Sequence, residues 1–212
     1  MNSRKLSIIT GISYLIIFFS AIFANFFMLE SLKQDPLDTI LHDHMMVRSG
    51  ILAFLITIVF DVVVAWGLFE LYSKHQLTRL STYFRLMHAA IFGVALFALV
   101  KTLDLKSENE ILGHVNTFEI IWLTGLFFFG AHLTLLAKII RQPKWIALFL
   151  VLAGIMYMVD TAAHFMLPGY DEVAGIFLAL VAIPGIFGEM AFTVWLLVKG
   201  GKDTIMASQT AD

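Results

Sequence analysis

Six apolar stretches of about 20 residues or more occupy almost the whole sequence. A helix rises about 1.5 Å per residue, so about 20 apolar residues suffice to cross the hydrocarbon core of a bilayer. The stretches are continuous and do not alternate with period two, which favours helices over a membrane barrel. We therefore predict an all-α, polytopic membrane bundle of six transmembrane helices. The expected spans are Leu6–Leu29, Val47–Tyr72, Ser81–Lys101, Val115–Ile140, Trp145–Met166 and Val173–Val198.

The composition agrees with a membrane location. Hydrophobic residues make up 59% of the 212 residues and charged residues only 14%, whereas charged residues form about a quarter of a soluble domain. The absence of cysteine excludes disulfides, thiolate metal sites, iron–sulfur clusters and dithiol redox chemistry. The short connections predict one transmembrane domain, residues 1–202, followed by a small polar tail, residues 203–212, that we expect to be disordered.

The connection after the first span has a helical pattern of its own. Asp35 is a residue type that caps helices, Pro36 suits a first helical turn, and Asp38 complements the positive helix end. The apolar residues that follow repeat at helical spacing: Leu37, Ile40, Leu41 and Met45. The pattern predicts a short amphipathic helix on the outer surface that runs into the second span.

The distribution of basic residues predicts the orientation, because cytoplasmic loops of membrane proteins are enriched in lysine and arginine. Of the 14 basic residues, one side carries Arg4, Lys5, Lys74, Arg79, Arg85, Lys138, Arg141, Lys144, Lys199 and Lys202. The other side carries Lys33, Arg48, Lys101 and Lys106. The first side is therefore expected to face the cytoplasm, with both termini, and the Glu30–Met46 loop is expected outside.

One layer of polar residues is expected within about 10 Å of the outer surface, given the helical rise. Asp160 and His164 are four residues apart and share a helix face, with Tyr157 one turn further in. We predict an outward-facing pocket for a small amphiphile or a lipid headgroup. Its candidate lining residues are Asn25, Arg48, Glu119, Tyr157, Asp160 and His164. Arg48 is expected to contact Asp160 or Glu119.

The same outer layer allows two other interpretations. His42, His44 and His114 lie in the outer loops and can close over Asp160 and His164. Imidazoles and carboxylates are ligands of zinc and other divalent metals, which activate water. A metal-dependent membrane hydrolase would use His42, His44, Asp160 and His164 as ligands. No cofactor other than this divalent metal is expected from the layer. Alternatively, the acids pair with Arg48 and only hold the helices together.

A second polar layer lies in the inner half of the spans. It consists of Asp61, Arg85, His88, His132 and Glu189. Charges inside a membrane normally face the bundle and pair, so Arg85 is predicted to bind Glu189, or otherwise Asp61. Pro184 removes a helical hydrogen bond just before Glu189, and a kinked span beside a buried carboxylate is also found in ion and proton pathways. Haem ligation by His88 and His132 is a further alternative.

Four stretches carry a resemblance to a known family: Val47–Gly50, Gly125–His132, Gly154–Asp160 and Gly188–Leu197. With these landmarks the chain resembles the bacterial membrane family known as domain of unknown function 4386, from about the first span to the end of the sixth. The resemblance implies a prokaryotic multi-pass membrane protein, expected in the cytoplasmic membrane. It brings no activity with it, and it does not extend to His42, His44 or His164.

Three classes of function remain open, and the sequence leaves open whether the protein is an enzyme. A binding or sensing module needs only the outer pocket and its Arg48. A metal-dependent hydrolase also needs a metal and access of water to Asp160 and His164. A proton- or ion-coupled transporter needs the two polar layers connected through the bundle. The expected partners are membrane lipids and a small amphiphilic ligand, and no nucleic-acid partner is expected.

Overall fold

A computed structural model describes residues 2–140 and 143–201. These residues contain helices and no strand, and six continuous helical segments are long and apolar enough to cross a membrane. The first segment, Ser3–Gln34, consists of α1 (Ser3–Ile22), a π-helical turn region η1 (Phe23–Leu29) and α2 (Glu30–Gln34). The others are α4 (His44–Leu71), α5 (Thr78–Thr102), α6 (Glu108–Ile139), α7 (Lys144–Met166) and α8 (Ala174–Val198). The predicted six-span bundle is confirmed.

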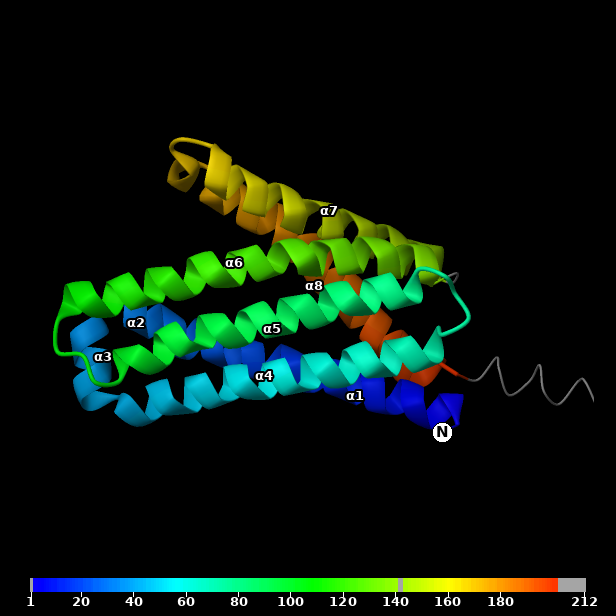
Figure 1. Cartoon of the computed structure of the whole chain (residues 1–212), viewed down its shortest axis with the longest axis horizontal. Helices are drawn as coiled ribbons and strands as arrows, with labels where there is room; N and C mark the ends of the chain where they lie inside the picture. The colour runs from blue at the N-terminus through cyan, green and yellow to red at the C-terminus, as the bar shows by residue number, and fades with distance from the viewer. Residues whose placement is uncertain (1, 141–142, 202–212) are drawn as a thin grey trace, which may run out of the picture.

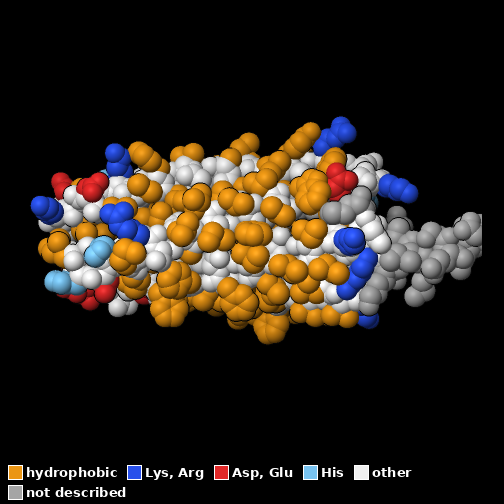
Figure 2. Space-filling model, turned by 90° about the horizontal axis from the view of Figure 1, so that it is seen from below, with side chains coloured by type: hydrophobic (Ala, Val, Ile, Leu, Met, Phe, Trp, Pro, Cys, Tyr) orange, Lys and Arg blue, Asp and Glu red, His pale blue; other side chains and the backbone are white. Residues whose placement is uncertain are grey.

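The membrane helices lie roughly along one long axis, and successive helices run in opposite directions (Figure 1). The N-terminus and the end of α8 lie at one end of the bundle, and α3 lies at the other (Figure 1). We name these ends inner and outer after the orientation that the basic residues predict. Hydrophobic side chains cover the middle of the visible surface, whereas charged side chains gather near its two ends (Figure 2). Such an apolar belt is what a lipid bilayer covers, so the chain is an integral membrane protein.

The short helix predicted for the outer connection is present as α3 (Pro36–His42). Pro36 occupies its first turn and Ile40 is buried, but the side chain of Asp35 makes no capping hydrogen bond. The helix stops at His42, and Met45 belongs to α4. Arg141, Lys202 and the predicted tail lie outside the described residues, so the division into residues 1–202 and 203–212 stays a prediction.

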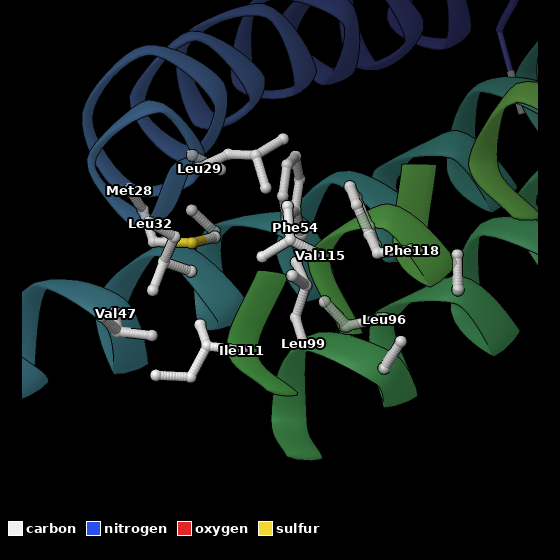
Figure 3. Close-up of a cluster of buried hydrophobic side chains, with 14 of the residues drawn as sticks. Met28, Leu29, Leu32, Val47, Phe54, Leu96, Leu99, Ile111, Val115 and Phe118 are labelled. Carbon is white, nitrogen blue, oxygen red and sulfur yellow. The ribbon is translucent and has the colours of Figure 1, made fainter. Parts of the chain in front are cut away.

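Two apolar clusters fill the interior. The outer one joins the π-helical region with α4, α5 and α6, and it includes Phe54 and Phe118 (Figure 3). We call Phe54, Phe92, Phe118 and Trp122 the aromatic stack. The ring centroid of Phe54 lies 5.2 Å from that of Phe92 and 5.3 Å from that of Phe118. The ring centroid of Trp122 lies 5.9 Å from that of Phe92. The inner cluster joins α1, α4, α6, α7 and α8. The buried charged and histidine side chains, Asp61, Arg85, His88 and His132, lie in the inner half of the bundle.

The last two helices leave the rest of the bundle toward its outer end. In Figure 1, α7 and α8 diverge from α6 as they approach the α7–α8 connection. No residue of α8 before Val181 is buried, while its C-terminal half packs on α7 and α1. Where α6 meets α7, Gly130 and Gly154 face each other so closely that a Cβ on either would lie 2.5 Å from the carbonyl oxygen of the other. This contact requires glycine on both helices.

Candidate functional site

Arg85 lies at the centre of a hydrogen-bonded network buried among four helices. Its side chain is 1% exposed and that of Asp61 on α4 is 3% exposed. One terminal nitrogen, Nη2, donates to Asp61 Oδ1 at 2.5 Å. The other, Nη1, donates to the Tyr14 hydroxyl of α1 at 3.1 Å and to His132 Nε2 of α6 at 3.2 Å. The guanidinium charge is therefore neutralised by one carboxylate and oriented by two further acceptors.

His132 extends the network toward the inner end of α5. Because its Nε2 accepts from Arg85, the ring proton is assigned to Nδ1, which donates to the Ser81 carbonyl oxygen at 3.0 Å. The Ser81 hydroxyl also lies 2.9 Å from Nδ1. Ser81 is the fourth residue of α5, so this branch of the network ends close to the inner end of the bundle.

His88 contacts the second oxygen of the Asp61 carboxylate. Its Nε2 lies 3.4 Å from Asp61 Oδ2, while its Nδ1 is buried with no hydrogen-bond partner among the described residues. A Cβ on Gly125 of α6 would lie 3.3 Å from that Nδ1. The arrangement suits a neutral imidazole whose Nε2–H donates and whose Nδ1 carries only a lone pair, since a buried N–H without an acceptor is costly.

Aromatic rings complete the enclosure of Arg85. The guanidinium carbon lies 4.9 Å from the centroid of Tyr14 and 5.3 Å from that of Phe129. Both distances are within the range of cation–π attraction. The Nε of Arg85 has no hydrogen-bond partner among the described residues, so the rings cover the part of the cation that the network leaves unbonded.

Glu189 is the acid that the sequence favoured as the partner of Arg85, and this preference is wrong. Arg85 bonds Asp61, which was the second choice, and the Glu189 side chain forms no hydrogen bond or ion pair with any described residue. Glu189 is half-buried on α8, one turn before Phe192, whose ring centroid lies 6.0 Å from that of Tyr14. The site thus contains one paired carboxylate and one unpaired carboxyl group.

A second set of polar residues follows α7 and α8 outward from Glu189. The hydroxyl of Tyr157 lies 3.7 Å from the position that a Cβ on Gly185 would take, one turn before Glu189. One turn further out on α7, Asp160 accepts a hydrogen bond of 2.5 Å from Tyr170 in the α7–α8 connection. Partial burial and this bond to Asp160 raise the pKa of the Tyr170 phenol. We call Glu189, Tyr157, Asp160 and Tyr170 the acidic column.

The candidate residues of the predicted outward-facing pocket that form side-chain bonds do so with partners outside the candidate set. Glu119 forms an ion pair with Lys33 of α2, and Arg48 is exposed and contacts neither Glu119 nor Asp160 through a hydrogen bond or ion pair. The expected bridge by Arg48 is therefore wrong. Two other candidates of this pocket also do not bond Arg48. The Asn25 amide donates to a carbonyl of its own helical segment. His164 is exposed, and its ring centroid lies 4.6 Å from that of Tyr170.

The described histidines do not gather into a metal site. Among residues 2–140 and 143–201, no group of three or more histidine, aspartate or glutamate side chains is placed to hold a metal ion. His42 bonds Asp38 of its own helix at 2.8 Å, and His44 begins α4. Both ring nitrogens of His132 are hydrogen-bonded within the protein, so its geometry offers nothing to a haem.

Three residues of these sites were missed by the sequence reasoning. Tyr14 and Ser81 join the buried network, and Tyr170 binds Asp160. Tyrosine and serine are ordinary residues of membrane helices and loops, so nothing in their local pattern distinguishes them. Only Tyr14 could have been found from the sequence. Its hydroxyl lies in the inner half of a predicted span, where a buried hydroxyl needs a hydrogen-bond partner.

Comparisons with known proteins give a family and no activity. The sequence model of a family described as "Domain of unknown function (DUF4386)" matches residues 9–200. An "Uncharacterized protein" of Archaeoglobus fulgidus is 31% identical over 159 residues, which are 72% of this chain and 85% of that relative. No solved structure matches the chain.

Proposed function

We propose that this chain, which belongs to the family described as domain of unknown function (DUF4386), is a proton-coupled membrane transporter. Its proton-carrying site would be Glu189 together with the network of Tyr14, Asp61, Arg85, His88 and His132. The single observation that carries the proposal is the unpaired, half-buried Glu189 beside a buried ion pair whose charges already cancel.

The charges of the site explain why a proton is the expected cargo. Arg85 and Asp61 sum to zero, and the geometry of His88 and His132 suits neutral rings. An ionised Glu189 therefore leaves one net negative charge in this site, and a protonated Glu189 leaves none. An uncompensated charge at this depth is costly, so Glu189 favours either a proton or another cation.

The neighbours of Glu189 provide polar groups on both sides of it. Tyr157 and the Asp160–Tyr170 pair lead along the acidic column to the outer connection. On the other side, the chain of bonds from Arg85 through His132 to Ser81 leads toward the inner end. A transporter needs its ion site to reach both surfaces in turn, and this arrangement supplies polar residues in both directions.

Infrared titration of the purified protein in detergent tests whether Glu189 exchanges a proton. The C=O band of protonated carboxyl groups should lose intensity as pH rises, and part of this change should disappear in Glu189→Gln. Glu172→Gln, which alters an exposed acid of the outer connection, should leave that part unchanged. A titration identical in wild type and Glu189→Gln would refute the proposal.

Transport itself is tested in sealed proteoliposomes that contain a pH-sensitive dye. An imposed pH gradient should dissipate faster with the wild-type protein than with Glu189→Gln when a transported solute is present on one side. The outward-facing pocket with Arg48 and the metal site both lack an assembled set of residues among those described, so neither is the basis of a second function.

A further inference from the structure

Glu189 is the one member of the inner polar layer, among the described residues, whose side chain has no bonded partner. Arg85 and Asp61 bond each other, His132 is bonded at both ring nitrogens, and His88 contacts Asp61. The carboxyl group of Glu189 is half-buried rather than enclosed. A carboxylate that is held in the membrane without a protein cation attracts a cation from elsewhere.

The surroundings of Glu189 on the outer side are open and apolar. From Ala174 to Leu180 no α8 residue is buried, and Ile176 and Leu178 are 62% and 68% exposed. This part of α8 diverges from the bundle together with α7 (Figure 1). A molecule that approaches Glu189 along this part of the helix therefore meets hydrocarbon surface first, which selects for a lipophilic body.

The polar groups that such a molecule meets are acids and phenols. Asp160 and Tyr170 stand near the outer end of the acidic column, and Tyr157 stands beside Gly185, one turn from Glu189. The nearest cation, that of Arg85, has its charge neutralised by Asp61. Aromatic faces and carboxylates together attract a positive charge through cation–π and ionic interactions.

We propose that Glu189 binds a lipophilic organic cation, which enters from the bilayer beside α7 and α8 and takes the place of the Glu189 proton. The inference rests on the proposed proton-coupled transport and names its substrate class. The exchange involves no covalent change: the carboxyl O–H bond breaks, the proton leaves to water, and the carboxylate pairs with the cation. One positive charge is exchanged for another, so the net charge of the site stays zero.

The groups that act on this exchange belong to α1 and α7, the two long helices that pack on α8, and to the buried network of α4, α5 and α6. They are Tyr14 of α1, Asp61 of α4, Arg85 and His88 of α5, His132 of α6 and Tyr157 of α7. Among these groups Arg85 alone carries a permanent positive charge, and its ion pair with Asp61 limits repulsion of an incoming cation. The phenols of Tyr14 and Tyr157 can donate hydrogen bonds to Glu189 or offer their ring faces.

Binding of tetraphenylphosphonium to the full-length protein in detergent tests the inference, because this probe is lipophilic and permanently charged. Saturable binding is expected, and it should weaken as pH falls, since protons compete for the same carboxylate. Glu189→Gln should bind about tenfold or more weakly, as expected for loss of a charge-assisted contact. Glu189→Asp should retain part of the affinity, and Glu172→Gln should bind as the wild type does.

Controls separate this inference from the proposed function. Triphenylphosphine oxide, a neutral molecule of similar size, should bind much more weakly, and equal binding would overturn recognition by charge. If the phosphonium does not bind to a folded protein whose Glu189 carboxyl band still titrates, the proposed substrate class is refuted and the proposed proton site is retained. Phosphonium binding that is independent of pH and releases no proton would instead overturn the proton coupling. Elution as a single peak in size-exclusion chromatography confirms that each variant is folded.

Discussion

Breaking the Arg85–Asp61 pair should destabilise the protein, and by a different amount for each partner. Removing one member of a buried ion pair costs about 3–5 kcal/mol, because a lone charge remains buried. Arg85→Met leaves Asp61 without its cation and also leaves the hydroxyl of Tyr14 and Nε2 of His132 without their donor. The Arg85→Met variant should therefore lie at the upper end of this range.

Asp61→Asn should be less costly for a reason that the structure supplies. The asparagine amide oxygen can still accept from Arg85, and Glu189 remains close enough to act as a replacement counter-ion. If it does, Asp61→Asn should cost about 3 kcal/mol, near the lower end of the range. Asp61→Asn combined with Glu189→Gln should then cost more than the sum of the two single changes.

Thermal unfolding in one detergent, followed by circular dichroism, measures these differences. One kcal/mol corresponds to about 2–4 °C in a chain of this size, so a loss of about 3–5 kcal/mol should lower Tm by about 6–20 °C. Arg79→Ala, which removes an exposed arginine of the same helix, should change Tm little. Equal Tm values for Arg85→Met and Arg79→Ala would refute the stabilising role of the network. An additive effect of the Asp61 and Glu189 changes would refute the replacement by Glu189.

Three further outcomes follow from the fold. In intact cells, an impermeant thiol reagent should label Asp38→Cys and not Lys74→Cys, because the distribution of basic residues predicts that residue 74 lies in the cytoplasm. The opposite labelling would refute this topology. Gly154→Ala should lower Tm, since its Cβ would lie 2.5 Å from the Gly130 carbonyl oxygen and overpacking costs about 1–3 kcal/mol; an unchanged Tm would contradict the close contact. Arg4→Met should cost about 1.5–3 kcal/mol, measured as a loss of Tm, because the guanidinium donates to carbonyls at the C-terminal end of α8.

The bundle and the depth of its polar residues could be predicted because both depend only on the position of residues along the sequence. Hydropathy along the sequence locates a span, and the helical rise locates a residue within it. Asp61, Arg85, His88 and His132 were accordingly placed in one inner layer, and they do form one network. Which members bond each other depends on how the helices cross and rotate, and a single sequence contains no such information.

Two errors illustrate this limit. The depth of Glu189 in its span favoured it as the ion-pair partner of Arg85. However, α8 packs at the side of the bundle, and α4 brings Asp61 to Arg85 instead. Arg48 was expected to contact Asp160 or Glu119, but Glu119 pairs with Lys33. The helical segment of the first span continues through the π-helical region to Gln34, five residues beyond the predicted Leu29, and this extension brings Lys33 to Glu119. Hydropathy ends a span where apolar residues end, whereas the helix continues into the polar region.

The aromatic stack separates the buried network from the outer end of the bundle and so limits the routes by which water or an ion can reach it. Phe54, Phe92 and Phe118 are at most 2% exposed and pack against one another between α4, α5 and α6, on the outer side of His88. A packed apolar layer of this kind excludes water and ions. A route from the outer side to Glu189 must therefore pass along α7 and α8, where the described polar residues include Asp160 and Tyr157. These helices also pack least against the bundle at their outer ends, so access to Glu189 depends on how α7 and α8 are placed against α1 and α6.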